Sequence, residues 1–304
     1  MYKLLVLDMD GTLLNEQCEI SKDNIEAIKK ARQSGVRVAI ATGRTKMGID
    51  PYLDQLGINV PGEFSVVCSG ARILENNNRE ILSSRLTRED LNDIVSFCRP
   101  NGFGMHLYST EGLIMDEESI FTYYDSAANN MPIIKMPFHE VTDAMPIDKV
   151  MVCNTHSQMV KALGKTFPSF DIPKNIIDEA LELEQSQDKV DKEAFNTLGC
   201  FPENFHKRYN LSCVFDSIVE ISKKEANKAY GIQTLMKMLD LKREEIMCIG
   251  DSQNDRHMVE FAGMGVAMGN ACDDLKNIAN DITKTNEESG VAHAIHKHIL
   301  NEQQ

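Results

Sequence analysis

Two aspartates that stand two residues apart, Asp8 and Asp10, follow directly on the apolar run Leu4–Leu7. A continuous apolar run that ends in a carboxylate is typical of a buried parallel strand, and residues i and i+2 of an extended chain face the same way. Two carboxylates held side by side repel each other unless a cation neutralises them or one of them takes up a proton. The pair indicates a metal or acid–base site at a strand end, although one such segment alone can also be a solvated turn.

Three further segments have similar positions later in the chain. Thr42-Gly43-Arg44 follows the apolar run 36–41, Lys228 opens a helix-like segment, and Gly250-Asp251-Ser252-Gln253-Asn254-Asp255 follows the run Ile246–Ile249. Parallel α/β sheets place their working groups at the carboxyl ends of the strands, so we expect these segments to meet. They would add a hydroxyl, backbone donors, a cation and two more carboxylates, and oxygen ligands of this kind suit Mg²⁺.

This set of side chains is suited to the cleavage of phosphate esters. A carboxylate nucleophile can split the hydrolysis of a phosphomonoester into two easier steps through an aspartyl-phosphate. A metal ion and a lysine can neutralise the phosphoryl oxygens, and a second acid can protonate the leaving oxygen and later activate water. The sequence contains one candidate for each of these roles.

The composition limits the possible partners. The chain has 304 residues and a formal net charge of -14, which suggests about two domains and a surface that repels nucleic acid and anionic membranes. Its 8 cysteines form no C-x-x-C pair, which favours free thiols in a reducing cytoplasm over zinc or redox sites. The first apolar run is too short for a signal peptide, and no stretch approaches the length of a membrane span. We expect a cytoplasmic enzyme with a small-molecule substrate and no nucleic-acid or membrane partner; the sequence does not reveal its oligomeric state.

The order of expected elements predicts an α/β protein with a Rossmann-like parallel-sheet core and an inserted α+β domain. Buried strands are expected at 4–7, 36–41, 64–68 and 246–249, and a hairpin at 71–83. The pattern changes near residue 84, where a helix capped by Thr87 begins, and clean α/β alternation returns in the last third of the chain. We expect the core to comprise 1–83 and 217–304 and the insertion 84–216; residues 170–210 have no clear pattern.

The four motifs together resemble the haloacid dehalogenase superfamily, and within it the Cof-type phosphatases with an inserted α/β cap of subclass IIB. D-M-D-G-T, T-G-R, a lysine at the start of a late helix and G-D-S-Q-N-D stand in the order and approximate spacing of that family. Further matches are Ala267-Met268-Gly269-Asn270-Ala271 and Ser289-Gly290-Val291-Ala292. The resemblance covers the two core segments well and the insertion only by position and length.

The resemblance implies a role for each matching residue. Asp8 is the expected nucleophile and a Mg²⁺ ligand, and Asp10 the general acid/base with its backbone carbonyl on the metal. Asp251 completes the metal site, and Asp255 is expected to hold the metal ligands or the lysine in place without itself binding the metal. The phosphoryl oxygens are expected to contact Thr42, Lys228, Asn254 and the amides of Met9 and Gly43. Arg44 can either contact the substrate or pair with a carboxylate, and the sequence does not separate the two.

The expected function is therefore a magnesium-dependent phosphatase of small phosphomonoesters such as sugar phosphates, with the cap selecting the substrate. The chain departs from the family where Ser69 stands for a frequent asparagine, which leaves a hydrogen bond at that turn in doubt, and where Ala229 stands for a glycine. Two alternatives remain open. A phosphotransferase or mutase would pass the same aspartyl-phosphate to a sugar hydroxyl, and a non-catalytic phosphosugar-binding protein would need neither Asp10 nor Lys228.

Overall fold

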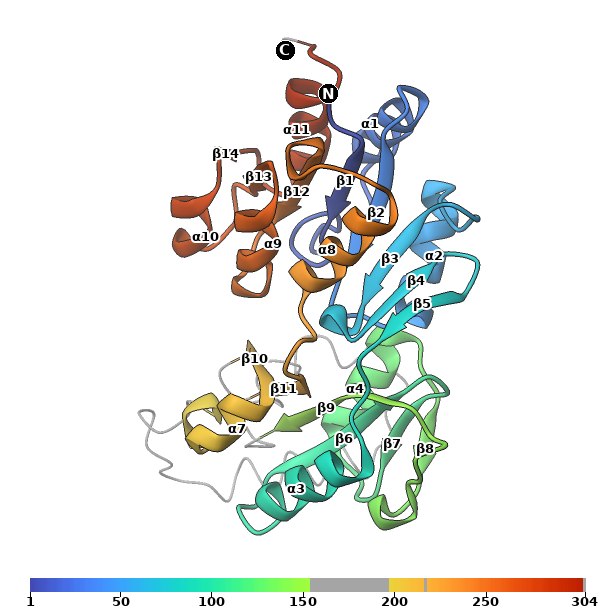
Figure 1. Cartoon of the computed structure of the whole chain (residues 1–304), viewed down its shortest axis with the longest axis vertical. Coiled ribbons are helices and arrows are strands. Elements are labelled where there is room, and N and C mark those ends of the chain that lie inside the picture. Colours follow the sequence, from blue (N-terminus) through green and yellow to red (C-terminus); the bar gives the residue numbers. More distant parts are fainter. Residues whose placement is uncertain (154–196, 216–217, 303–304) are drawn as a thin grey trace. The chain divides into compact units, whose positions relative to one another are not determined.

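The structure, a computed structural model that describes residues 1–153, 197–215 and 218–302, divides into two compact units (Figure 1). The first unit consists of residues 1–83 and 226–304, and the second of residues 84–225. The chain re-enters the first unit at Ala226, whereas the sequence predicted that this core segment begins at residue 217. The difference arises because the strand Ile218–Lys223 pairs within the sheet of the second unit. Strand patterning revealed this segment but not the sheet to which it belongs.

The first unit is built on an eight-stranded sheet with the order β14-β13-β12-β1-β2-β3-β4-β5. Its strands are β1 (Leu4–Leu7), β2 (Arg37–Ala41), β3 (Phe64–Val67), β4 (Arg72–Glu75), β5 (Arg79–Ser83), β12 (Ile246–Gly250), β13 (Met264–Ala267) and β14 (Asp281–Ile282). Neighbours from β14 to β3 are parallel, and the hairpin β4–β5 continues the sheet in antiparallel order. The carboxyl ends of β1, β2 and β12 therefore lie side by side, as the motifs require.

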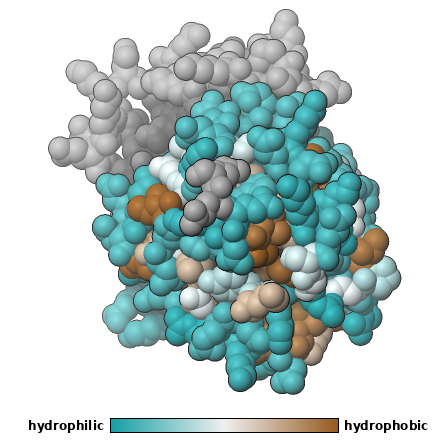
Figure 2. Space-filling model, turned by 90° about the horizontal axis from the view of Figure 1, so that it is seen from above, coloured by the Kyte–Doolittle hydropathy of each residue, from teal (hydrophilic) through white to brown (hydrophobic). Residues whose placement is uncertain are grey.

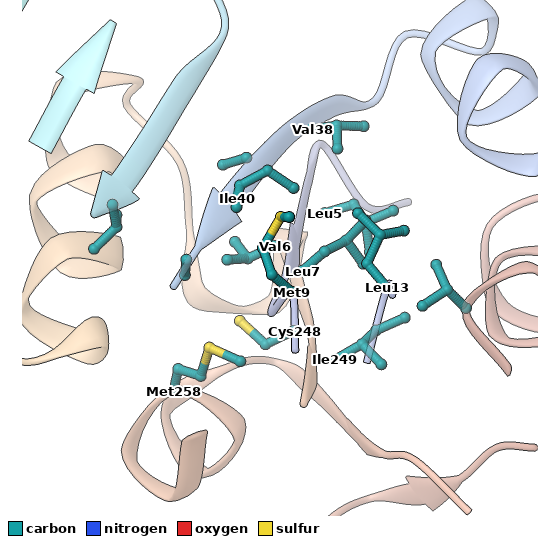
Figure 3. Close-up of a cluster of buried hydrophobic side chains, with 14 of the residues drawn as sticks. Leu5, Val6, Leu7, Met9, Leu13, Val38, Ile40, Cys248, Ile249 and Met258 are labelled. Carbon is teal, nitrogen blue, oxygen red and sulfur yellow. The ribbon is translucent and has the colours of Figure 1, made fainter. Parts of the chain in front are cut away.

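Helices cover both faces of this sheet. All four residues of β1 are fully buried, and because successive side chains of a strand point to opposite faces, neither face is open to solvent there. Figure 3 shows apolar side chains of β1, β2 and β12 gathered around this strand. The helices form two contacting groups, α1, α2 and α11 in one and α8, α9 and α10 in the other. Their bounds are α1 (Lys22–Gln33), α2 (Lys46–Leu56), α8 (Lys228–Met238), α9 (Arg256–Phe261), α10 (Asp273–Ile278) and α11 (Gly290–His298), with short 3₁₀ turns η1 (Cys68–Gly70), η5 (Arg243–Glu245) and η6 (Gln253–Asp255).

The second unit contains a six-stranded, mainly antiparallel sheet with the order β10-β11-β9-β6-β7-β8. Its strands are β6 (Gly104–Ser109), β7 (Leu113–Met115), β8 (Ile133–Lys135), β9 (Ile147–Cys153), β10 (Tyr209–Phe215) and β11 (Ile218–Lys223). The described helical elements are α3 (Arg88–Cys98), η2 (Phe138–Glu140), α4 (Ile120–Asn129), η4 (Thr197–Cys200) and α7 (Glu203–Arg208). Thr87 caps α3 through a reciprocal hydrogen-bonded pair with Asp90, as expected from the sequence. Most of the stretch 170–210, which has no clear sequence pattern, lies outside the described residues.

The two faces of the second sheet differ in chemistry. Along β6, Met105 and Leu107 belong to an apolar core shared with α3 and α7, whereas His106 and Tyr108 alternate with them and bond to residues of α4. In the part of the chain that the structure describes, no helix is long and apolar enough to cross a membrane. Figure 2 shows a mostly hydrophilic face with hydrophobic side chains in small separate groups.

Candidate active site

The first carboxylate is held at the end of β1 by the sheet itself. The amide of Asp8 donates to the carbonyl of Ile249 at 3.1 Å, which continues the pairing of β1 with β12 by one residue. Met9 and Leu13, on either side of the following turn, are fully buried among the apolar side chains of Figure 3. These two anchors fix the turn, so the Asp8 carboxylate is buried at a defined position.

Gly11 and Thr12 connect this turn to the loop after β12. Gly11 has a φ of 75°, and a Cβ there would lie only 2.5 Å from Oδ2 of Asp251. Glycine is therefore required both for the backbone conformation and for the approach of the second carboxylate. The hydroxyl of Thr12 donates to Oδ1 of Asp251 at 2.8 Å. No role was expected for Thr12, although its place within D-M-D-G-T is a signal that could have revealed this contact.

Lys228 lies at the centre of the site. It is the first residue of α8, whose N-cap Asn227 accepts from the amide of Tyr230. Its Nζ donates to Oδ1 of Asp8 and to Oδ1 of Asp255, both at 2.6 Å. The ammonium is thus completely enclosed between two carboxylates, and a third contact reaches Oδ1 of Asn254 at 3.4 Å.

Asp255 has little capacity left for other partners. Its Oδ2 accepts the backbone amides of Asp251 and Ser252 at 3.0 and 3.1 Å, while its Oδ1 accepts from Lys228. The residue therefore closes the loop that follows β12 and holds the ammonium of Lys228.

The site contains more negative than positive charge. Oxygen atoms of Asp8, Asp251 and Asp255 lie within 4.8 Å of one another, and of the described residues only these acids form a cluster of the kind that could hold a metal ion. Burial, and then the charge of Asp255, raise the pKa of Asp8 well above its usual range despite Lys228, and raise that of Asp251 to about 6. Burial alone would lower the pKa of Lys228, but Asp255 and Asp8 outweigh it and keep the pKa above its ordinary value.

Asp10 and Arg44 form a separate pair at the rim of the site. Nε of Arg44 donates to Oδ2 of Asp10 at 2.9 Å and Nη2 to Oδ1 at 2.6 Å, a bidentate geometry. The side chain of Asp10 is 57% exposed and that of Arg44 14%, and the guanidinium lies over the ring of Tyr52. The sequence leaves open whether Arg44 contacts the substrate or pairs with a carboxylate, and the structure shows it paired with Asp10.

Thr42 and Gly43 follow β2 beside this pair. The amide of Thr42 donates to the carbonyl of Val66 in β3 at 2.9 Å, and its hydroxyl accepts from the amide of Arg44 at 3.1 Å. Asn270, in a loop after β13, donates to the carbonyl of Gly11 at 2.8 Å. Asn270 belongs to a sequence match to which no role was assigned, and the structure places it in support of the first turn.

Comparison with known proteins identifies the family. A family model for haloacid dehalogenase-like hydrolases matches residues 5–295. The chain is 28% identical over 310 residues to the phosphatase YwpJ of Bacillus subtilis (strain 168), across 98% of this chain and 100% of the relative. It is also 28% identical over 296 residues to the 5-amino-6-(5-phospho-D-ribitylamino)uracil phosphatase YwtE of the same organism, across 96% of each chain.

Solved structures agree with this result. A haloacid dehalogenase-like hydrolase from Bacteroides thetaiotaomicron superimposes with a TM-score of 0.74 at 28% identity, over 98% of this chain and 99% of that one. A sugar phosphatase of subclass IIB superimposes with a TM-score of 0.69 at 23% identity, over 97% and 98% of the two chains, and supports the fold. The chain therefore belongs to the haloacid dehalogenase-like hydrolases.

Proposed function

We propose that this protein is a magnesium-dependent phosphatase that hydrolyses small phosphomonoesters, such as sugar phosphates, through an aspartyl-phosphate on Asp8. The observation that carries the proposal is the buried group of Asp8, Lys228 and Asp255 beside Asp251, in which the negative charges outnumber the one ammonium. Such a group favours the uptake of a cation, or of a proton by one of its acids. The name of YwtE describes a substrate with a phosphoribityl group, and it supports the choice of a small phosphomonoester.

The donor set fits Mg²⁺. Mg²⁺ usually binds through one or two carboxylates together with water and substrate phosphate. Asp255 is occupied by Lys228 and two backbone amides, so Asp8 and Asp251 are the carboxylates available for the ion, with the backbone carbonyl of Asp10 as the proposed third ligand. When bound, the ion would neutralise phosphoryl oxygens as charge develops on them.

We propose the following steps for the chain's own groups. A carboxylate oxygen of Asp8 forms a bond to phosphorus as the bond to the ester oxygen breaks, and the leaving oxygen takes a proton from Asp10. Water then attacks phosphorus, gives its proton to Asp10, and releases inorganic phosphate from Asp8. Lys228, Thr42 and the amide of Gly43 are the proposed contacts of the phosphoryl oxygens.

Asp10 must change partners during this sequence. Both of its carboxylate oxygens accept from Arg44 in the structure. We therefore assign Arg44 to orienting Asp10, and proton transfer to the ester oxygen requires that one of these two hydrogen bonds opens. The second unit, residues 84–225, is the proposed source of substrate selectivity.

The test is phosphate release from a panel of small phosphomonoesters in the presence of Mg²⁺. Asp8→Asn should lower turnover by at least about 10⁴-fold, as removal of a nucleophile does in other enzymes, and a chelator should abolish turnover. Asp240→Asn is the matched control, because Asp240 is exposed and its φ of 50° is one that asparagine tolerates. Full activity of Asp8→Asn would refute the nucleophile assignment.

The same panel separates the alternatives. Phosphate that appears on an added sugar instead of in solution would indicate a phosphotransferase. Saturable binding of a phosphosugar without turnover over the whole panel would indicate a binding protein.

A further inference from the structure

The turn η1, residues Cys68–Gly70, has an unusual backbone next to the proposed phosphate site. Its three consecutive residues all have left-handed φ values, 50° for Cys68, 54° for Ser69 and 98° for Gly70. Residues other than glycine adopt this region at a cost in free energy, and such strain persists only where the surrounding structure imposes it. The contacts of η1 show what imposes it.

On one side, η1 is bonded to the backbone of the loop after β2. The amide of Cys68 donates to the carbonyl of Arg44, and the amide of Ser69 donates to the carbonyl of Thr42, both at 2.9 Å. The two carbonyls flank Gly43, and a Cβ at Gly43 would lie 3.4 Å from the hydroxyl of Ser69. The turn therefore supports the segment whose hydroxyl and amide are the proposed contacts of the phosphoryl group.

On the other side, η1 lies against the start of α8. A Cβ at Gly70 would lie 2.2 Å from the carbonyl oxygen of Asn227 and 2.7 Å from its nitrogen. Asn227 is the N-cap of α8 and immediately precedes Lys228. The same helix is in tight contact with β3, because a Cβ at Gly231 would lie 2.4 Å from Cγ1 of Val66. No side chain can be placed at Gly70 unless the backbone at the helix start moves.

We propose that η1 is a positioning element that sets the separation between the Thr42–Arg44 loop and the ammonium of Lys228, with Gly70 as its critical residue. The inference rests on the proposed function, in which both groups contact one phosphoryl group. The strained turn is the connection through which the backbone of one is fixed against the backbone of the other. A displacement of about 1 Å between groups that act together can lower a rate by about 10²-fold.

The test compares Gly70→Ala with Gly35→Ala. Both glycines have similar φ values, 98° and 93°, so both substitutions impose the same kind of backbone strain. A Cβ at Gly35, however, meets nothing within 4 Å. At matched fractions of folded protein, Gly70→Ala should lose about 10²-fold in kcat/KM, mainly in kcat, whereas Gly35→Ala should keep the wild-type value.

Binding of inorganic phosphate in the presence of Mg²⁺, measured by calorimetry, gives a second readout. Gly70→Ala should bind phosphate more weakly than Gly35→Ala. If Gly70→Ala does not fold, Gly231→Ala replaces it, since it displaces the same helix through the side chain of Val66, and it should lower kcat and phosphate affinity in the same direction but less. The inference would be overturned if Gly70→Ala, or Gly231→Ala in its place, had the same kcat/KM and the same phosphate affinity as the Gly35→Ala control.

The two proposals fail in different ways. An active wild-type enzyme with an equally active Gly70→Ala would reject the positioning role and leave the proposed function intact. A wild-type protein that hydrolyses no substrate would reject the proposed function, and the comparison of phosphate affinities would still decide whether η1 positions the two groups.

Discussion

The two units each bury a group of ionisable side chains, but the groups differ in their balance of charge. In the first unit, Lys228 is the one ammonium among Asp8, Asp251 and Asp255, and the pKa values of Asp8 and Asp251 are raised by burial and by Asp255. Their charged forms are therefore less favourable than in water. A buried group in this condition is balanced by a cation from outside the chain or by a proton on one of its acids.

In the second unit, a buried carboxylate is fully matched by donors. Oδ2 of Asp125 is 2.7 Å from Nε2 of His106 and accepts the hydroxyl of Tyr108, and Oδ1 accepts from Asn129 at 2.8 Å. Burial alone would raise the pKa of Asp125, but the hydrogen bond with His106 and the further donors outweigh it and lower the pKa. The contrast teaches that burial of an acid does not by itself indicate chemistry, whereas burial without matching donors does.

The largest expected effect comes from removing one buried lysine from each unit, Lys228 from the first and Lys149 from the second. Lys228→Met leaves the carboxylates of the first unit without their ammonium, and Lys149→Met leaves Glu220, which accepts from Lys149 at 2.5 Å. Loss of one partner of a buried ion pair destabilises by about 3–5 kcal/mol, so both variants should unfold at lower urea concentration in the presence of a chelator.

Mg²⁺ distinguishes these two variants. Relative to the wild-type protein under the same conditions, Mg²⁺ should narrow the stability deficit of Lys228→Met, because the remaining carboxylates can still bind it. It should leave the deficit of Lys149→Met unchanged, because that variant keeps the Mg²⁺ site of the wild-type protein. Equal narrowing of the deficit in both variants, or narrowing in neither, would contradict the difference drawn between the two units.

The second effect is the stabilisation of the wild-type protein by Mg²⁺. A ligand at a hundredfold excess over its Kd stabilises the folded state by about 2.7 kcal/mol. Thermal unfolding with and without Mg²⁺ should show this gain in the wild-type protein and in Asp240→Asn, and little of it in Asp251→Asn. A gain that survives in Asp251→Asn would place the ion elsewhere.

A smaller effect separates the two buried aspartates. Asp125→Asn replaces an acceptor that has three donors, and it should lower the free energy of unfolding by about 1–3 kcal/mol. Asp8→Asn should lower the stability of the metal-free protein less, because a neutral side chain is favoured at that position and Lys228 keeps its bond to Asp255. Urea unfolding of both variants in chelator tests the comparison, and losses of the same size would contradict it.

The sequence predicted the elements that carry the site because their signals are local. Leu4–Leu7 and Ile246–Ile249 are continuous apolar runs, as buried parallel strands usually are, and the motifs follow them directly. Helix α2 has no comparable signal, since Pro51 and Gly48 interrupt its helical pattern. It forms because Thr45 caps it and because Ile49, Leu53 and Leu56 are buried against the rest of the first unit.

Two features depend on contacts that no local pattern contains. The partner of Arg44 could not be chosen from sequence, because a guanidinium beside the proposed phosphate site suits both a substrate anion and the Asp10 carboxylate. The strain in η1 was equally hidden, since Cys68 and Ser69 are not residues that indicate a left-handed backbone. Both features arise from distant segments that meet at the end of the sheet.

The smallest effect that sharpens the comparison is the pH dependence of the stability of the metal-free protein. The raised pKa of Asp251, about 6, means that the folded state binds this proton more tightly than the unfolded chain, whose aspartate pKa is about 4. The resulting stability is present below the pKa of the unfolded chain and is lost as the pH rises through about 6.

Asp125 has the opposite shift, so its contribution is present above the unfolded pKa and is lost as the pH falls. In chelator, the stability of the wild-type protein relative to Asp251→Asn should therefore fall as the pH rises from about 4 to about 6, while its stability relative to Asp125→Asn should not. If the stability of the wild-type protein relative to Asp251→Asn rises with pH instead, the carboxylate of Asp251 is matched within the chain, as that of Asp125 is. The first unit then has no need of a cation at this position.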